Sequence, residues 1–524
     1  MGKTTTQRTK NTRWILYSVA VACFLLINGV FLYKVVTVSG STLLLVAITL
    51  ILWFGITVFF LVWRKQKNRT NRIFMIILVV LGVMYSAVFP PATVPDEFYH
   101  FESSYKYSDY LMLKDPQADA LPMRADDKTM LDASQKDLTY QSYTTVKDNL
   151  SLLSTDSTEV TVTPLNAFGF DTNPPQLKIP SALGITLARL LDLGSYPLFY
   201  LGRLFNFLFF ALLAFFAVKI TPVAKKAFMA ISLLPMTLHI TSSFSYDAGI
   251  LGLSFLLIAL CLKAIYSKER VATRVFVGIA VVTFLLAPCK VIYALLAFMV
   301  LLIPLKAFSS KPRAILFKTG VPLLSIGTVL LFRLATMSSL ASMGSTAADA
   351  LGSRGGDQGQ LHSIFEFFSD PMGTITLFIK TLDQFGDFYF STTIGGSLGW
   401  FQPGLVAPWF IVLAFALILL LSFLRSPKDD YEVPFKHKLL YVILSCGMFF
   451  GVMLSMFLGW TFQSDFYIMG VQGRYFLPFL PLIALVIYNR TIVVKKDLSS
   501  LILFAMLAFN LAYLVRLFAY STIG

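Results

Sequence analysis

The chain has 524 residues, of which 56% are hydrophobic and 14% are charged, and its mean hydropathy is +0.72. These values exclude a water-soluble globular domain and indicate an all-α polytopic membrane protein. The net charge of +15 does not predict a nucleic-acid partner, because the Lys and Arg residues cluster in short connectors between apolar segments, as in cytoplasmic loops. The cysteines lie in apolar segments without a paired spacing, which argues against disulfides and a zinc site.

The apolar segments predict about thirteen membrane spans. A basic N-terminus precedes the first segment, which is longer than the apolar region of a signal peptide and lacks a small-residue cleavage site, so we interpret it as a retained span. The predicted spans lie near residues 14–38, 41–63, 73–89, 197–220, 227–244, 248–266, 274–288, 290–305, 319–335, 404–424, 439–460, 475–489 and 499–520.

The basic connectors all fall on one side of this alternation, which we assign to the cytoplasm. Two long polar segments, 91–178 and 336–403, then lie outside the membrane. The predicted organisation is an N-terminal membrane hairpin (1–72), a catalytic membrane module that includes outer loop 91–178 (73–335), an extracytoplasmic loop with an amphipathic segment (336–403) and C-terminal membrane helices (404–524).

The two outer segments carry their own local patterns. The stretch PDEFYHFESSYKYSDYLML predicts an amphipathic helix, whereas 139–166 is rich in Thr, Ser and Val and predicts strand or loop. The aromatic segment 363–390 is amphipathic, so we expect it to lie along the outer surface rather than to cross the membrane. The loop GSRGGDQG lacks the spacing of a phosphate-binding P-loop and predicts a flexible connection.

Two adjacent carboxylates, Asp96 and Glu97, follow the third predicted span directly. The preceding Thr93-Val94-Pro95 has the spacing of a capping box, so both acids could serve only a helix N-terminus, although capping does not require two acids beside a membrane. His100 would share a helix face with Asp96, where a hydrogen bond is a simpler interpretation than a metal site.

Other polar residues are predicted at the same outer boundary as the two acids. They are Arg203, Asn206, Tyr246, Asp247, Lys290 and Arg474. The charged residues among them have structural alternatives, namely helix capping for Asp247, snorkelling to the interface for Arg203 and Lys290, and a structural arginine in GVQGRYFLP. Because charges beside hydrocarbon cost several kcal/mol unless they are paired or hydrated, both signs at one depth predict a polar cavity that opens outward.

Such a cavity holds the groups needed for glycosyl transfer from a lipid-phosphate sugar. A carboxylate can remove the proton of an acceptor hydroxyl as it attacks the sugar, while Arg and Lys neutralise the phosphate that leaves.

The successive motifs VPDEFYHFESSYKYSD, NPPQLKIPSALGITLARLL, YLGRLFNFLFF, LLPMTLHITSSFSYDAG, APCKVIYALLAFMVLLIP and GVQGRYFLPFLPL resemble those of a family of bacterial polytopic membrane proteins catalogued as a domain of unknown function. That family is itself similar to the GT-C glycosyltransferases. The resemblance covers about residues 75–490, and the order of the motifs is more specific than any one of them. It implies a GT-C-like helical bundle in the bacterial plasma membrane, with an extracytoplasmic active site that uses polyprenyl-phosphate sugars.

By position, the family's acidic motif falls on Asp96-Glu97, and its other polar motifs fall on Arg203, Asp247, Lys290 and Gln472-Gly473-Arg474. The acidic motif reads DEFYH here, where the family pattern is closer to DEPAH. The predicted roles are catalysis for Asp96, Glu97 and His100, donor phosphate binding for Lys290, Arg474 and Arg203, and substrate binding for Tyr246, Asp247, Gln472 and Asn206. Which acid is the base stays open.

The expected partners are a polyprenyl-phosphate-linked sugar, a cell-envelope glycan acceptor and the lipid bilayer. No protein metal ligands are assigned, and a divalent metal remains compatible with the acids. Two other functions stay open on the sequence: a transporter of lipid-linked sugars or polysaccharides, and a polysaccharide polymerase or ligase that uses a polyprenyl-diphosphate donor.

Overall fold

The fold comes from a computed structural model of the whole chain, which describes residues 70–116, 120–164, 174–342, 361–426, 431–489, 492–494 and 497–523, together with Gly29 and Tyr33. The predicted spans at 14–38 and 41–63 lie outside these residues, apart from Gly29 and Tyr33. The GSRGGDQG loop also lies outside them.

Within this part of the chain, six helices are long and apolar enough to cross a membrane. They are α3 (Thr70–Val88), α9 (Ser195–Ile220), α12 (Asp247–Ile265), α14 (Lys311–Ser342), α19 (Phe435–Trp460) and α21 (Ser499–Ile523). Shorter apolar helices are α8 (Ile179–Leu190), α13 (Thr273–Leu286), the 3₁₀ helix η2 (Val291–Leu302), α18 (Trp409–Phe423), and the 3₁₀ helix η6 (Gly473–Phe479) with α20 (Leu480–Ile487). The predicted class of all-α polytopic membrane protein is confirmed at this level.

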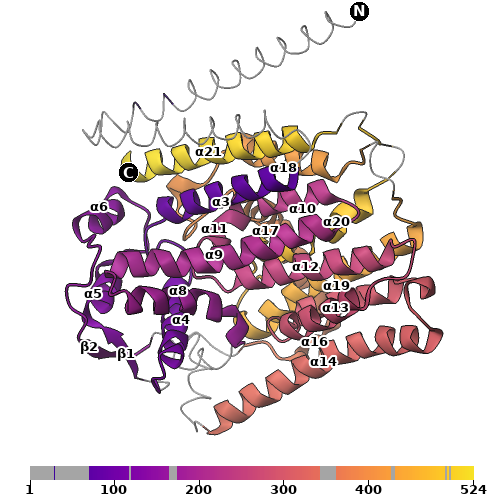
Figure 1. Cartoon of the computed structure of the whole chain (residues 1–524), viewed down its shortest axis with the longest axis horizontal. Coiled ribbons are helices and arrows are strands. Elements are labelled where there is room, and N and C mark those ends of the chain that lie inside the picture. The colour runs from indigo at the N-terminus through magenta and orange to yellow at the C-terminus, as the bar shows by residue number, and fades with distance from the viewer. Residues whose placement is uncertain are drawn as a thin grey trace, which may run out of the picture.

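Helix α12 forms the centre of the bundle, and 89% of its most apolar window is buried. It is apolar on all sides, as expected of a helix surrounded by protein. It packs against α9, α13 and η2, while α3 and α21 pack against each other on one side of the bundle (Figure 1). Gly252 allows α12 to approach α9 closely, because an added Cβ would lie 2.8 Å from Leu213.

The segment predicted as one span at 227–244 is two short helices. They are α10 (Lys225–Ser232) and α11 (Pro235–Thr241), separated by Leu233 and Leu234. Proline is well tolerated in the first turn of a helix but not in its interior, so Pro235 ends the apolar continuity here and starts a new helix. Leu233 and Leu234 continue the apolar run up to the proline, so hydropathy alone does not show the break.

A small cap, built from residues 97–162, lies at one end of the bundle (Figure 1). It holds α4 (Glu97–Leu111), β1 (Leu121–Arg124), α5 (Ala125–Ala133), α6 (Tyr140–Asp148) and β2 (Glu159–Val162). The two strands are antiparallel, with Leu121 opposite Val162 and Arg124 opposite Glu159. The predicted helix at α4 is present. The expectation of strand or loop over 139–166 is correct for β2 and wrong for α6, which Thr139 and Ser142 cap reciprocally.

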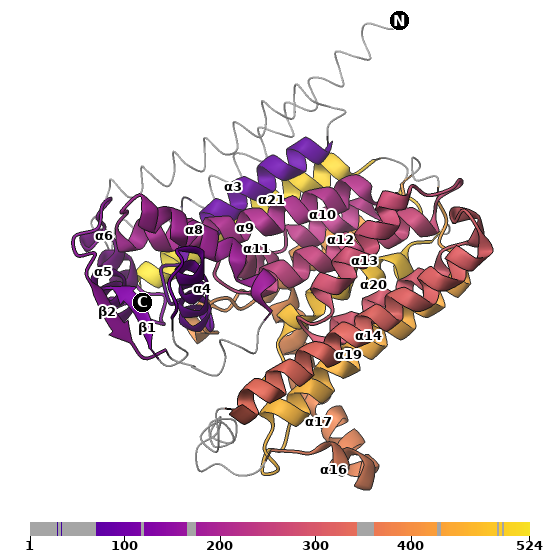
Figure 2. The same ribbon diagram turned by 60° about the horizontal axis from the view of Figure 1, so that its bottom comes forward.

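The aromatic segment at 363–390 forms α16 (Ile364–Ser369) and α17 (Pro371–Ile394), and Figure 2 shows α16 beyond the bundle, with α17 leading from it into the bundle. The C-terminal part of α17 packs against η6. That this segment lies along the surface stays a prediction. The remaining short 3₁₀ helices are η1 (Pro175–Leu177), η3 (Leu305–Ala307) and η5 (Pro403–Leu405).

Candidate functional site

Asp96 lies at the N-cap position of α4 in a left-handed conformation, with φ 61° and ψ 12°. Asp visits this region more readily than most residues, and a non-glycine residue held there is often part of a functional site. Its side chain makes no capping hydrogen bond, so the capping interpretation is wrong for this carboxylate. The side chain is 53% exposed. The Asp96 carboxylate is therefore exposed to solvent and does not cap the helix.

Glu97, the next residue, is enclosed in protein. Its two oxygens accept hydrogen bonds from Arg203 Nε at 2.8 Å and Nη2 at 2.6 Å, and neither side chain is exposed. Arg203 also donates to the backbone carbonyls of Ser86, Phe89 and Pro90, where α3 ends. This bidentate pair therefore joins α4 to α9 and to the end of α3, and the geometry favours a positioning role for both residues.

The turn before α12 depends on the same pair. Phe244 N–H donates to Glu97 Oε1 at 3.2 Å, and Asn206 Nδ2 donates to the carbonyls of Ser243 and Ser245 at 2.7 and 3.0 Å. Asn206 is buried. These bonds fix the turn that carries the following residues, Tyr246 and Asp247. Asn206 therefore has a positioning role, since its amide group binds the backbone of that turn.

Asp247 and Arg474 connect the exposed acid Asp96 to the partly buried cation Lys290. Lys290 Nζ donates to Asp247 Oδ1 at 2.8 Å, and Arg474 Nε lies 3.7 Å from Asp247 Oδ2. Arg474 Nη2 reaches Asp96 Oδ2 at 3.4 Å, a long hydrogen bond. The structure thus brings Asp96, Asp247, Lys290 and Arg474 into one contiguous group, as predicted from their expected depth.

Arg474 keeps unused hydrogen-bonding capacity. Its side chain is 8% exposed, yet its Nε is buried without a hydrogen-bond partner among the described residues. An unsatisfied guanidinium donor is costly, and a bound anion would relieve that cost. The enclosed Nε faces Asp247 Oδ2 at 3.7 Å, so Arg474 makes only long contacts to the two acids of the site.

The turn that carries Arg474 is clamped against α17. Gly473 N–H donates to Thr392 Oγ1 and its carbonyl accepts from Thr393 Oγ1, both at 3.1 Å. A Cβ on Gly473 would lie 2.2 Å from Thr393 N, so only glycine fits here. Gln472, predicted to bind substrate, is half-buried at the N-cap position of η6.

Aromatic rings surround the Lys290 ammonium. It lies 4.3 Å from the ring centre of Tyr475 and 5.2 Å from that of Tyr246, both within cation–π range. Tyr475 is fixed in turn by Tyr293, whose hydroxyl donates to the Tyr475 carbonyl at 2.8 Å. These rings hold the lysine in one place without adding negative charge.

His100 pairs with a lysine instead of with Asp96. Lys178, between η1 and α8, is fully buried and its Nζ lies 2.9 Å from His100 Nδ1. The Lys178 ammonium also lies 5.3 Å from the rings of Tyr99 and Tyr246. Burial, aided by the charge of Lys178, holds the pKa of His100 well below its usual range, so the ring is neutral. Burial also lowers the pKa of Lys178 to about 7, although Asp247 opposes that shift.

The site has an excess of cations. Among the described residues of the site, Lys178, Lys290 and Arg474 are accompanied by two carboxylates, Asp96 and Asp247, because Glu97 and Arg203 neutralise each other. Among the described residues no cluster of three or more His, Cys, Asp or Glu side chains could hold a metal ion. The arrangement suits a small anion with an acid at its edge.

A cavity of about 410 Å³ adjoins this group. Residues of η2, α14 and α19 line it, mostly Val, Ile, Leu and Met side chains, and Lys290 and Tyr475 belong to its wall. An apolar cavity therefore meets the cationic side of the site.

The comparison with known proteins gives a family. The sequence pattern of the family described as "Predicted membrane protein (DUF2142)" matches residues 78–483. The chain belongs to this family. No curated protein and no solved structure matches the chain. The DUF2142 match covers every residue placed in the site above.

Sequence reasoning missed two cations of this region, Lys178 and Arg333. Lys178 is the one charge in the apolar stretch PPQLKIPSALGI, and Arg333 is the one charge in TGVPLLSIGTVLLFRLATMSSLAS. A charged residue isolated in an apolar segment is the signal that would have found both.

Proposed function

We propose that this protein is a membrane glycosyltransferase of GT-C type. In this proposal it moves a sugar from a polyprenyl-phosphate donor to a hydroxyl of a cell-envelope glycan on the outer face of the membrane. The observation that carries the proposal is the continuous group Asp96–Arg474–Asp247–Lys290, with a half-exposed carboxylate at one end and an apolar cavity at the other.

Asp96 is the general base in this proposal. It accepts the proton of the acceptor hydroxyl while the hydroxyl oxygen forms a bond to the anomeric carbon and the bond from that carbon to the phosphate oxygen breaks. The phosphate oxygen keeps the electron pair. Arg474 and Lys290, which lie beside Asp96 and Asp247, stabilise the charge that develops there.

The two candidate donors differ in the charge of their phosphate. A polyprenyl-phosphate sugar is a phosphodiester with one negative charge, whereas a diphosphate-linked sugar carries two. With Lys178 near its pKa, the three cations and two carboxylates around Asp96 leave about one positive charge or less, and Arg333 of the adjoining cavity adds one more. Charge alone therefore does not choose between the two donors, and the transfer assay below does.

Transfer by the purified protein in lipid tests this proposal. We expect label to pass from polyprenyl-phosphate hexoses to an acceptor extract of the cell envelope, and not from polyprenyl-diphosphate or nucleotide sugars. Transfer from the diphosphate donor alone would contradict the proposal and favour a polysaccharide polymerase or ligase. Movement of intact donor across a vesicle membrane, without transfer, would replace it by the transporter.

A further inference from the structure

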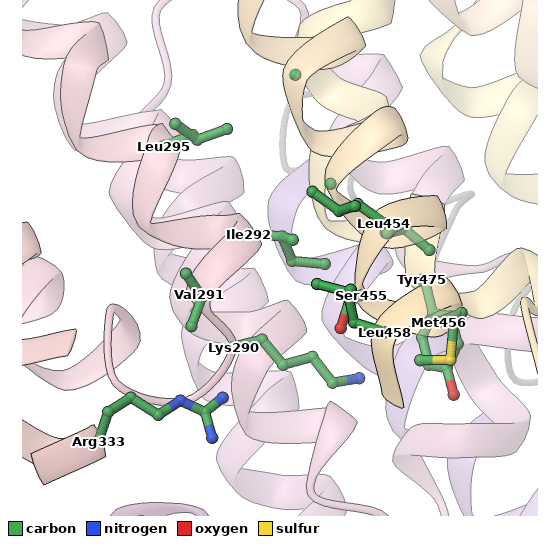
Figure 3. A pocket seen from close by; sticks show the side chains of 13 residues that line it. Lys290, Val291, Ile292, Leu295, Arg333, Leu454, Ser455, Met456, Leu458 and Tyr475 are labelled. Carbon is green, nitrogen blue, oxygen red and sulfur yellow. The ribbon is translucent and has the colours of Figure 1, made fainter. Parts of the chain in front are cut away.

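The cavity beside Lys290 contains a second cation that the site described above does not use. Arg333 of α14 lines the same cavity as Lys290. Figure 3 shows both cations at one end, with their charged groups directed into the space, while Leu295 lies toward the other end. The cavity is therefore charged at one end and apolar along its length.

Arg333 has no ion pair with any described residue. It is exposed, and the described residues that line the cavity include no carboxylate. An arginine in an apolar span is costly unless it snorkels to the interface or meets an anion. Its position in the cavity wall favours the anion, because Lys290 is already paired with Asp247 whereas the Arg333 guanidinium has no carboxylate partner among the described residues.

The cavity wall fits a hydrocarbon chain. Gly447 and Gly451 of α19 face η2, and a Cβ on Gly451 would lie 2.9 Å from Ile292, so this side of the cavity is closely packed. The rest is lined by aliphatic side chains, and Ser455 is exposed within it. A long apolar chain with a phosphate at one end is complementary to this combination.

We propose that this cavity holds the polyprenyl chain of the lipid carrier and that Lys290 and Arg333 together bind its phosphate after sugar transfer. The inference rests on the proposed function for the origin of the phosphate. Cleavage of the bond between the anomeric carbon and the phosphate oxygen converts a phosphodiester with one charge into a monoester with about 1.5 to 2 charges at pH 7. Arg333 supplies the additional positive charge that this product needs.

Binding of the carrier itself tests the inference without any transfer. The purified protein in lipid is titrated with polyprenyl phosphate, with the corresponding polyprenol, and with phosphatidylglycerol as a competitor. For Arg333→Ala we expect about tenfold weaker binding of polyprenyl phosphate and unchanged binding of polyprenol, because only a charged contact is lost. Arg313→Ala is the matched control, since Arg313 lies near the start of the same helix and is bonded to Ser309.

A second variant tests the apolar part of the cavity. Ser455→Phe fills it from an exposed position, so we expect weaker binding of polyprenyl phosphate and polyprenol alike. Ile443→Phe adds bulk at an exposed position of α19 outside the cavity and should leave both unchanged. Unchanged binding of polyprenyl phosphate in Arg333→Ala, or equal competition by phosphatidylglycerol, would overturn the inference and leave a snorkelling arginine beside ordinary membrane lipid.

The outcome separates this inference from the proposed function. Selective carrier binding without transfer from any donor would retain the lipid-phosphate cavity and reject the transferase. Transfer with carrier binding that neither variant alters would retain the transferase and reject the cavity.

Discussion

Asp96 and Glu97 are adjacent in sequence but belong to two different regions of the molecule. Glu97 lies in a closed region, where Arg203 satisfies both of its oxygens and no solvent reaches the pair. Asp96 lies in an open region, with a half-exposed carboxylate and one long contact to Arg474. The comparison teaches that two adjacent acids can have opposite environments, because Glu97 is enclosed and paired whereas Asp96 stays exposed, and the proposed function assigns the chemistry to Asp96.

The largest expected effect is the loss of stability when the closed region around Glu97 is disrupted. Arg203→Ala leaves the buried carboxylate of Glu97 without its partner, which costs about 3–5 kcal/mol. We expect a large fall in the thermal unfolding temperature of the protein in lipid. Arg313→Ala removes an exposed arginine and should change stability by less than about 0.5 kcal/mol.

A different result for Arg203 would show that the closed region also takes part in donor binding. If Arg203→Ala unfolded like the wild type but lost binding of the donor, the arginine would contact the phosphate, as the family resemblance implied. Stability and donor binding must therefore be measured on the same preparation.

The next largest effect concerns donor binding in the open region around Asp96. Arg474→Gln removes the guanidinium beside Asp96 and Asp247, and a hydrogen bond to a charged group contributes about 1.5–3 kcal/mol. We expect the dissociation constant of the donor to rise by about ten- to hundredfold, with folding retained. Lys380→Gln, which removes an exposed cation from the neighbouring α17, should leave donor affinity unchanged. Equal affinity in Arg474→Gln and the wild type would remove this residue from the phosphate site.

The smallest effect is a pH dependence at Lys178. Burial lowers the pKa of Lys178 to about 7, whereas the unfolded value is about 10.4. The lysine therefore becomes charged as the pH falls through 7, while His100 stays neutral because burial keeps its pKa low. Donor binding should strengthen by about 1 kcal/mol or less between pH 8 and pH 6.

The variant Lys178→Met should abolish that dependence. The same shift has a consequence for folding: between about pH 7 and pH 10 the unfolded chain binds the proton that folded Lys178 has lost, so stability rises with pH in this window. A wild-type protein whose donor affinity and stability stay flat across both ranges would contradict a titrating Lys178.

Much of the membrane architecture could be predicted from the sequence, because a long apolar segment in a bilayer forms a helix in nearly every case. The helices around α3, α9, α12 and α19 coincide with predicted spans. The break at Pro235 was missed because both sides of it are apolar, and α6 was missed because Thr- and Ser-rich sequences suit caps as well as strands.

The sequence predicted which residues form the site better than it predicted what each of them does. Asp96, Asp247, Lys290 and Arg474 converge, since each follows or precedes a span at one boundary. What the sequence could not show is that Glu97 pairs with an arginine 106 positions away. Burial of that pair comes from tertiary packing, and no local pattern separates Glu97 from its neighbour.

The central claim is that Asp96, and not Glu97, is the reactive carboxylate. The most direct measurement is the transfer rate from a polyprenyl-phosphate hexose, expressed per folded molecule, for the wild type, Asp96→Asn and Glu97→Gln. We predict that Asp96→Asn unfolds like the wild type and transfers about 10²- to 10⁴-fold more slowly, whereas Glu97→Gln loses stability and keeps transfer in its folded fraction. Full transfer by folded Asp96→Asn would contradict the account.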